Sequence, residues 1–371
     1  MILESITLKN FRNHKNAFFE FSLQTTLVAG ENAAGKTNLL EAIYLVASGR
    51  SLRVKGVESE MIGYGEEIAN IKAKTEKCNL EIILTKGELF GKRVSKKKYL
   101  VNQIARRTVD FLGNIRAVYF GPENLELITD SPSLRRKYLD AVLSQVDSEY
   151  ARASLSYEKG LKTRNKILEK IRELQETDSS AESVGASRKK LYFWDQLLIK
   201  NGNIITLKRE EFIEFLNKNS ELLNCGEEKR QSPRFSLFYD RSTISEERLK
   251  QYSQQEIASA TTLVGPHRDD FIIKSVGSFG LENRERDLSV YGSRGEQRLA
   301  ILWLKLGELG FIEEKTGEKP ILLLDDIFSE LDLEHRKLVF DVTFEKQTII
   351  TTADLGMVET SWLKDVKLIS L

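Results

Sequence analysis

The sequence predicts an α/β fold that carries a phosphate-binding loop and is interrupted by a long helical insertion. Three observations support this prediction. An apolar strand pattern at Leu27 and Val28 is followed by a glycine-rich turn and a helix pattern. A second buried-strand pattern, residues 320–328, contains two adjacent carboxylates. The residues from about 133 to 261 are mostly helical and charged. Strand, glycine turn and helix in that order are typical of nucleotide-binding α/β units.

The composition limits the class of protein. The chain has 371 residues, of which 41% are apolar and 30% charged, and this is enough apolar material for a packed core. The 56 basic residues nearly balance the 55 acidic ones, so a nucleic-acid site must be a local patch. No apolar run is long enough for a membrane span, and the N-terminus has no secretory pattern. Only Cys78 and Cys225 occur, which argues against a disulfide scaffold. We therefore expect a cytoplasmic protein.

The first element in the chain with a chemical role is the phosphate loop. Residues 30–37 read GENAAGKT and match the pattern G-x-x-x-x-G-K-[ST]. Glycines let the backbone wrap closely around phosphates, and the amide N–H groups and the positive helix end bind anions. We expect Lys36 to reach the β and γ phosphates of ATP, the Thr37 hydroxyl to ligate Mg²⁺ and the Asn32 amide to reach the γ phosphate. The alternative is a chance match in a glycine turn. The residues expected to contact the nucleotide here are Gly30, Glu31, Asn32, Ala33, Ala34, Gly35, Lys36 and Thr37.

The middle of the chain predicts an antiparallel helical arm. Apolar residues recur every seven positions from Leu191 to Phe212, and Leu161 and Leu168 show the same spacing in the preceding segment. Between them, residues 175–187 have the composition of a turn. Ordinary core packing within one large domain is the alternative.

An acidic pair follows a buried strand near the C-terminal end. Four consecutive apolar residues, 321–324, suit a strand buried on both faces of a parallel sheet, and such strands end at the ligand crevice. We expect Asp325 to hold Mg²⁺, directly or through water, and Asp326 to polarise the attacking water. Asp326 and Lys36 are thus the predicted catalytic residues. Adjacent carboxylates repel, so a bound cation or a raised pKa is expected. A solvated helix-cap pair is the alternative.

A third motif connects these elements to a known family. Residues 292–300, GSRGEQRLA, place a serine and a glycine at a helix start, which can bind phosphate. The phosphate loop, this S-x-G segment and DDIFSELD at 325–332 together resemble ABC-type ATPases, specifically the SMC-like branch that acts on DNA. NFRN at 10–13, residues 118–140 and GPHRDD at 265–270 resemble bacterial recombination mediators of the RecF family over essentially the whole chain. Ala33 and Ser131-Pro132 depart from the family, whose members often have glycine there.

The resemblance implies a division of the chain and a dimeric site. It implies an ATPase lobe formed by residues 1–130 and 263–371, with residues 131–262 as an inserted, mostly helical lobe. It also implies an ATP-driven homodimer, in which each nucleotide lies between the phosphate loop of one subunit and the signature of the other. The signature residues are Ser293, Gly295 and Glu296. By the same resemblance, Arg12 and Asn13 lie near the nucleotide, Asp332 belongs to a loop that crosses the interface, and Glu123 is a weakly assigned lobe-coupling residue.

The resemblance also implies a function. Such a protein is an ATP-dependent DNA-binding recombination mediator and a slow, DNA-stimulated ATPase. Its dimer clamps duplex DNA near single-strand gaps and assists RecA loading in gap repair, replication restart and the SOS response. The implied partners are double-stranded and gapped DNA, RecR, RecO, RecA and single-strand-binding protein.

A basic segment is the candidate DNA site. Residues 92–107 contain seven cations and no acidic residue. Such a patch neutralises phosphates without selecting sequence. A solvated hairpin edge, whose lysines prevent pairing with another strand, explains the charge equally well, and only the resemblance favours DNA. The cations are Lys92, Arg93, Lys96, Lys97, Lys98, Arg106 and Arg107.

Two other functions stay open at this stage. The ATP-binding subunit of an ABC transporter would have a much shorter separation than the one between Lys36 and Gly295. It would also carry a γ-phosphate-sensing histidine where this chain has Thr351-Thr352-Ala353-Asp354. An ATP-dependent DNA scaffold that does not hydrolyse ATP fits the sequence as well as an active ATPase. Of the three histidines, His267 is expected to be a structural hydrogen-bonding residue near the lobe junction.

Overall fold

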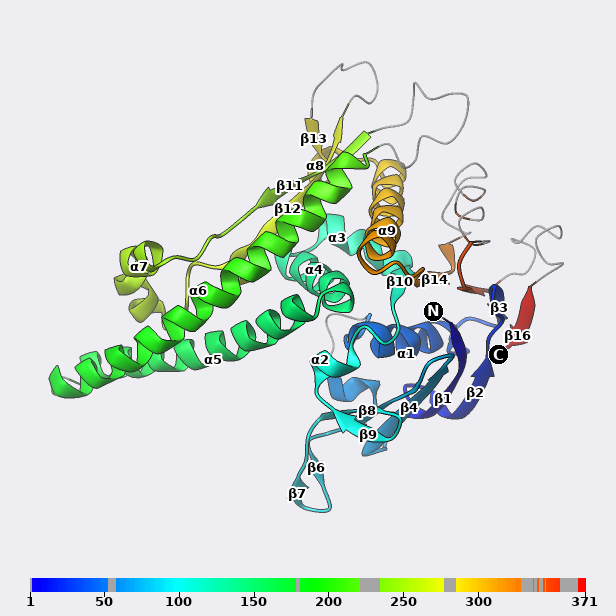
Figure 1. Ribbon diagram of the computed structural model, residues 1–371, viewed down its shortest axis with the longest axis horizontal. Helices are drawn as coiled ribbons and strands as arrows, with labels where there is room; N and C mark the ends of the chain where they lie inside the picture. The colour runs from blue at the N-terminus through cyan, green and yellow to red at the C-terminus, as the bar shows by residue number, and fades with distance from the viewer. Residues whose placement is uncertain are drawn as a thin grey trace.

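The computed structural model describes residues 2–52, 58–177, 181–220, 234–276, 285–327, 345–353 and 366–371, together with Arg336, Val339 and Thr343. A five-stranded parallel sheet forms the centre of the molecule (Figure 1). Its strands all run in the same direction, and its side chains alternate between two apolar clusters, one on each face. The sheet joins strands from both ends of the sequence, which confirms the α/β prediction. The strand order is β10 (Ala117–Phe120), β14 (Ile321–Asp325), β15 (Thr348–Thr352), β3 (Thr25–Ala29) and β16 (Lys367–Ser370).

A six-stranded antiparallel sheet lies on the other side of helix α1 (Lys36–Ser48). The helix contacts strands of both sheets, and every residue from Leu39 to Ser48 is buried. A helix that is apolar on all sides must be covered on all sides, and the two sheets provide this cover. The strand order is β2 (His14–Glu20), β1 (Leu3–Phe11), β4 (Ile68–Thr75), β5 (Asn79–Thr85), β8 (Lys97–Val101) and β9 (Ile104–Arg106).

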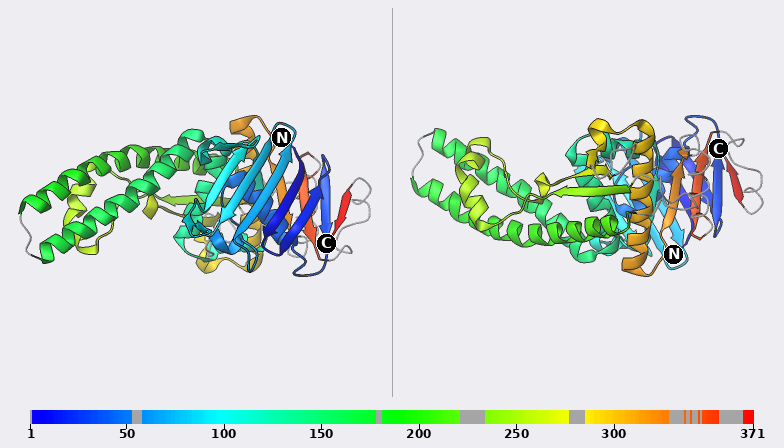
Figure 2. Two further views of the ribbon diagram at one scale, coloured as in Figure 1. Left: turned by 90° about the horizontal axis from the view of Figure 1, so that it is seen from below. Right: turned by 90° about the horizontal axis from the view of Figure 1, so that it is seen from above.

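Two long helices, α5 (Ser148–Glu176) and α6 (Ala181–Lys218), form the predicted arm. They lie side by side and project from one side of the sheets (Figure 2). Leu198, Ile205 and Phe212 of the seven-residue repeat are buried. The base of the arm packs on α4 (Pro132–Val146) and α9 (Arg294–Thr316), and α7 (Glu246–Ser259) lies against α5.

A third sheet corrects the expectation of purely helical structure between residues 133 and 261. Strand β11 (Arg234–Asp240) lies in this range, and its buried residues Phe235 and Leu237 alternate with more exposed ones. It pairs with β12 (Asp270–Val276), which pairs with β13 (Glu285–Asp287). The β11–β12 pairing therefore crosses the lobe boundary expected at 262–263.

The short elements complete the described chain. Across the described helices, none combines the length and the low charge that crossing a bilayer demands. The short elements are η1 (Glu58–Met61), β6 (Glu88–Leu89), β7 (Lys92–Arg93), α2 (Thr108–Phe111), η2 (Pro122–Leu125), α3 (Glu126–Thr129), η3 (Pro266–Arg268) and α8 (Leu288–Tyr291).

Candidate nucleotide site and basic groove

The phosphate loop and the acidic pair meet at one edge of the parallel sheet. Strand β15 lies between β14 and β3, with Asp325 in register with Thr351 and Thr351 in register with Val28. Parallel strands end at the same edge, where open α/β sheets bind their ligands. The loop that follows Ala29 and the carboxylates at the end of β14 therefore border the same crevice.

The Lys36 ammonium is held by backbone carbonyls of the loop. Its side chain is buried, and its Nζ donates to the Gly30 and Glu31 oxygens at 2.7 and 2.8 Å. Within the loop, Ala33 has a φ of 68°, in the left-handed region. A residue with a Cβ pays about 1–2 kcal/mol there, which explains why glycine suits this position.

The side chains of Asn13 and His14 contact backbone carbonyls of the phosphate loop. The Asn13 Nδ2 donates to the Ala34 oxygen at 3.2 Å, and the His14 Nε2 lies 3.1 Å from the Gly35 oxygen. Gly35 has a φ of 110°, and a Cβ there would lie 2.8 Å from the side chains of both Asn13 and His14, so only glycine fits. Burial lowers the pKa of His14. His14 directly follows the NFRN motif, and this position is the one signal in the sequence that points to its contact with the loop.

Arg12, which is expected near the nucleotide, is bound to the buried Glu41 of helix α1. Its Nε and Nη2 bind both Glu41 carboxylate oxygens, at 2.8 and 2.7 Å, and its Nη1 donates to the Glu60 oxygen at 2.9 Å. Glu41 is fully buried and also accepts a hydrogen bond from Ser51. Removing one partner of such a buried pair typically costs about 3–5 kcal/mol. Arg12 therefore anchors helix α1, and Asn13 is the member of this pair that contacts the loop.

Asp325 is fixed by two hydroxyl groups from the neighbouring strands. The Tyr119 hydroxyl of β10 lies 3.0 Å from Oδ2, and the Thr351 hydroxyl of β15 donates to Oδ1 at 2.5 Å. Thr351 thus takes part in orienting the carboxylate. Burial, then repulsion by Asp325, raises the pKa of Asp326, and the Lys36 ammonium opposes this rise. The raised pKa agrees with the sequence expectation for adjacent carboxylates.

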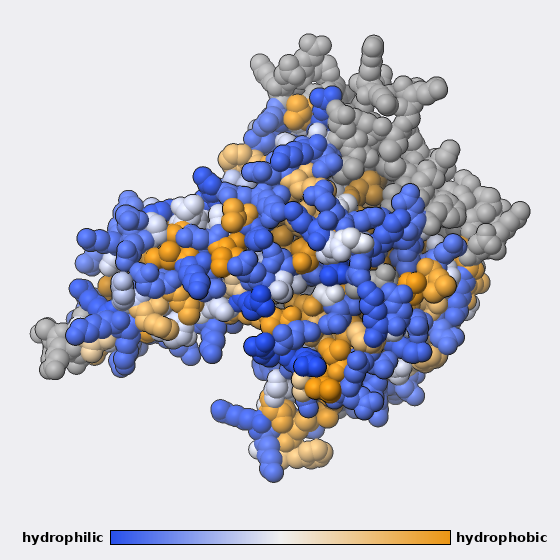
Figure 3. Space-filling view, in the orientation of Figure 1, coloured by the Kyte–Doolittle hydropathy of each residue, from blue (hydrophilic) through white to orange (hydrophobic). Residues whose placement is uncertain are grey.

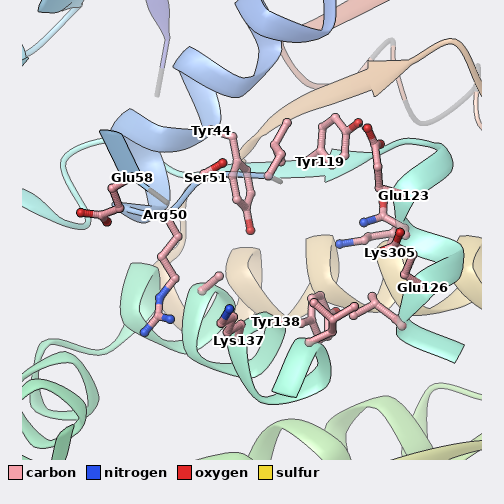
Figure 4. Close-up of a pocket in the computed structure, with 15 residues that line it drawn as sticks. Tyr44, Arg50, Ser51, Glu58, Tyr119, Glu123, Glu126, Lys137, Tyr138 and Lys305 are labelled. Atoms are coloured by element: carbon pink, nitrogen blue, oxygen red, sulfur yellow. Dashed lines mark hydrogen bonds between the residues drawn. The ribbon is translucent and has the colours of Figure 1, made fainter. Parts of the chain in front are cut away.

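Glu123 is linked to Asp325 through Tyr119. The Tyr119 hydroxyl also lies 2.7 Å from Glu123 Oε2, so its single proton is shared between two carboxylates. Tyr119 and Glu123 border a cavity of about 210 Å³ between α1 and α4, which Lys305 of α9 also lines (Figure 4). The Lys305 Nζ sits 4.5 Å from the centre of the Tyr138 ring. Glu123 therefore lies where the carboxylate end of β14 meets the helical part of the molecule.

The signature segment begins helix α9 at a separate place (Figure 1). Ser293 is the N-cap, and Ser293 and Gly295 are exposed. One carboxylate oxygen of Glu296 accepts from the Ser293 N–H at 2.9 Å, and the other accepts from Arg286 at 2.8 Å. This capping box fixes the helix start. Asp332 lies outside the described residues.

The GPHRDD segment joins the arm to the rest of the molecule. Arg209 of α6 is buried and donates to Asp269 at 2.9 Å. His267 Nε2 lies 2.9 Å from the Thr262 oxygen and Nδ1 lies 2.8 Å from the Tyr157 hydroxyl. A carbonyl only accepts, so Nε2 carries the proton and Nδ1 accepts from Tyr157. Burial lowers the pKa of His267 to about 4, which keeps the ring neutral. The predicted structural role of His267 is confirmed.

The basic residues gather on β7, β8 and β9, but Lys97 stands apart from the rest. Its side chain is only 10% exposed, and its Nζ donates to the Gly49 oxygen at 3.0 Å and to Glu58 at 2.6 Å. Lys97 is therefore occupied within the protein and is a poor phosphate contact. Arg107 is exposed and pairs with Asp110. The exposed patch consists of Lys92, Arg93, Lys96, Lys98, Arg106 and Arg107.

A groove extends this patch to the arm. It has a volume of about 640 Å³, and the described residues that line it include no carboxylate. Arg152 and Leu155 of α5 line this groove together with Lys98 and Arg106. The place of Arg152 in this groove is not visible in the sequence, because the residue lies far along the chain in the helical arm.

Comparisons with known proteins place the chain in a family. The model of the RecF/RecN/SMC N terminal domain matches residues 2–369. The DNA replication and repair protein RecF of Gloeothece citriformis (strain PCC 7424) is 34% identical over 396 residues, covering 100% of this chain and 98% of the relative. The RecF of Bacillus cereus (strain G9842) is 34% identical over 385 residues, covering 100% of this chain and 96% of the relative.

Solved structures agree with this placement. A structure of the recombination mediator RecF with ATP, from the RecFOR pathway, has a TM-score of 0.80 and 33% identity and covers 96% of this chain and 93% of that one. An Smc head bound to the C-winged helix domain of ScpA, 16% identical, has a TM-score of 0.51, covers 100% of this chain and 94% of that one, and shares the fold. The chain therefore belongs to the RecF family of DNA replication and repair proteins.

Proposed function

We propose that this protein is an ATPase of DNA repair whose ATP-bound homodimer closes on duplex DNA next to a single-strand gap. Lys36 and the loop 30–37 bind the phosphates, and Ser293 and Gly295 of a second copy complete the site. The observation that carries the proposal is the placement of the phosphate loop and the Asp325–Asp326 pair at one edge of the same sheet.

The residues at this edge suit ATP and Mg²⁺. The left-handed Gly35 lets the loop pack against Asn13 and His14, where a Cβ would clash, and the loop places Lys36 beside its own carbonyls. Thr37 and Asp325 offer hard oxygen ligands, and Mg²⁺ commonly needs only one or two protein ligands beside the phosphates. When bound, the ion neutralises charge on the phosphate oxygens.

Asp326 is the residue proposed to orient the attacking water. Its raised pKa makes it a better proton acceptor than an ordinary aspartate once it is ionised, and Lys36 lies near enough to influence it. Tyr119 and Thr351 hold Asp325, so that Asp326 is positioned by a rigid neighbour.

The exposed signature supports the dimer. Val290 and Tyr291 are 67% and 69% exposed immediately before Ser293, which places apolar surface beside an anion-binding helix start. A γ phosphate held by two chains is lost on hydrolysis. Dimer stability therefore follows the nucleotide state.

Sedimentation with and without nucleotide tests this proposal. We expect a monomer without nucleotide or with ADP, and a dimer with ATP. In Gly295→Asp, the new side chain has room in the monomer, where its Cβ lies 4.0 Å from the Ser293 Oγ, but it faces phosphate in the dimer, so the variant is expected to bind ATP and stay monomeric. Analytical ultracentrifugation, with and without duplex DNA, measures this.

The matched control is Gly185→Asp, which also enters open space, on the arm. It should dimerise like the parent protein. A parent protein that stays monomeric with saturating ATP, Mg²⁺ and DNA while hydrolysing ATP at its usual rate refutes the dimeric site.

The exposed basic patch is the proposed duplex contact. We expect the double variant Lys98→Glu and Arg106→Glu to weaken DNA binding and to reduce the slope of log K against log salt by about 0.9 per lost phosphate contact. Fluorescence anisotropy over a salt series measures both quantities. Lys15→Glu, at an exposed site on β2 at the opposite edge of the sheet, is the control. An unchanged slope would move the DNA site elsewhere.

The cellular role is proposed from the same site. A clamp that closes next to a gap marks the place where recombinase is needed, so we propose that the protein assists RecA loading in gap repair, replication restart and the SOS response. RecR, RecO and single-strand-binding protein are the proposed partners, supported by the RecFOR pathway to which a similar structure belongs. Cytoplasmic location is part of this proposal.

A further inference from the structure

The hairpin of β6 and β7 presents an unusual residue at its tip. Leu89 pairs with Lys92, so the turn has two central residues, Phe90 and Gly91. Both have positive φ, 49° and 73°. A two-residue turn with two positive φ angles is of type I′ and strongly favours Asn or Asp followed by Gly. A phenylalanine at the first position is therefore unfavourable for the turn itself.

Packing does not account for Phe90. Its side chain is 94% exposed, although an aromatic ring gains most of its stabilising effect from burial. Figure 3 shows apolar side chains on the protrusion below the body of the molecule and a hollow between this protrusion and the arm. A residue that is unfavourable for its backbone and is left exposed is a candidate for a function outside the folded chain.

The surroundings of Phe90 favour a polyanionic ligand. Lys92 and Arg93 form the second strand of the same hairpin, and both are exposed. The chain then continues to Lys98, Arg106 and the groove that Arg152 completes. A ring flanked by exposed cations has the two parts of a single-strand binding surface, since cations bind the backbone and aromatic rings stack on bases.

We propose that Phe90 stacks on an unpaired base where single-stranded DNA meets duplex DNA. This inference rests on the proposed DNA contact of the basic patch. The groove with Lys98, Arg106 and Arg152 holds the duplex backbone, and the hairpin extends beyond it to the first exposed base. In a continuous duplex, each base face is covered by its neighbours, so Phe90 finds no partner without unstacking a step.

The test distinguishes the effect of the aromatic ring on DNA binding from the effect of the turn conformation. Phe90→Asn removes the ring and installs the residue that the turn favours, so the hairpin is retained. Phe90→Trp keeps an aromatic face. Affinity for a duplex with a single-stranded tail and for a fully paired duplex of equal length is measured by anisotropy, with the whole chain and ATP. A 2-aminopurine at the first unpaired base reports stacking directly.

We expect Phe90→Asn to bind the tailed duplex roughly fivefold to a hundredfold more weakly, the range that corresponds to stacking on one base, and to leave the 2-aminopurine unquenched. Affinity for the fully paired duplex should not change, and Phe90→Trp should restore both signals. The control is Phe18→Ser, which removes an exposed ring at the opposite edge of the sheet and should change neither DNA affinity.

Three results overturn the inference. If Phe90→Asn keeps the parent's affinity for the tailed duplex, Phe90 does not stack on a base, and the proposed DNA function stands because the parent still binds. Phe90 also does not stack on a base if Phe90→Asn keeps its DNA affinities and loses only its association with a partner protein. If the parent protein binds neither DNA, the proposed DNA function itself fails, and the inference fails with it.

Discussion

Replacement of Lys36 by alanine is expected to abolish ATP binding. The Lys36 ammonium is the buried cation of the phosphate loop, and it already makes two hydrogen bonds to the loop carbonyls at 2.7 and 2.8 Å. Hydrogen bonds to charged groups contribute about 1.5–3 kcal/mol each, so loss of two such bonds to phosphate lowers the affinity by about a hundredfold or more. Isothermal titration calorimetry with ATP measures this loss.

Two controls accompany this variant. Lys9→Ala removes an exposed lysine of β1 and should leave ATP affinity unchanged. A thermal unfolding scan checks that Lys36→Ala is folded, which we expect because the surrounding loop keeps its own contacts, including that of Asn13 with the Ala34 oxygen. Retention of tight ATP binding by a folded Lys36→Ala protein would refute the role assigned to the loop.

The second large effect is expected from Asp326→Asn. The amide cannot accept the proton of an attacking water, and general bases contribute about 10²–10⁴-fold to rate. The variant should bind ATP, dimerise and hydrolyse ATP more slowly by that factor. Phosphate release under single-turnover conditions measures the rate, and ultracentrifugation measures the dimer.

Asp325→Asn is the matched comparison at the adjacent position. Asp325 is the proposed metal ligand, so its variant should lose Mg²⁺-dependent nucleotide affinity rather than turnover alone. If Asp326→Asn hydrolyses ATP at the parent rate, Asp326 has no catalytic role. If the parent protein itself shows no turnover while it dimerises with ATP, the protein acts as a scaffold that only binds ATP.

Elements whose evidence is local or periodic can be predicted from the sequence alone. The phosphate loop was visible because strand, glycines, lysine and helix occur within a few residues of each other. The buried strand before Asp325 was visible as a continuous apolar run, and both of its faces are covered. The arm was visible through its seven-residue repeat.

Which side chains meet across the chain depends on the packing of distant segments. Tyr119 binds Asp325 from a strand far away in sequence, and Arg152 reaches the basic groove from the arm. Lys97 looks like its neighbours in the sequence, yet Glu58 and the Gly49 oxygen bind its ammonium. Composition and spacing report which faces are apolar and where charges gather. They do not report the partner of a given polar group, because that partner is set by how distant segments pack together.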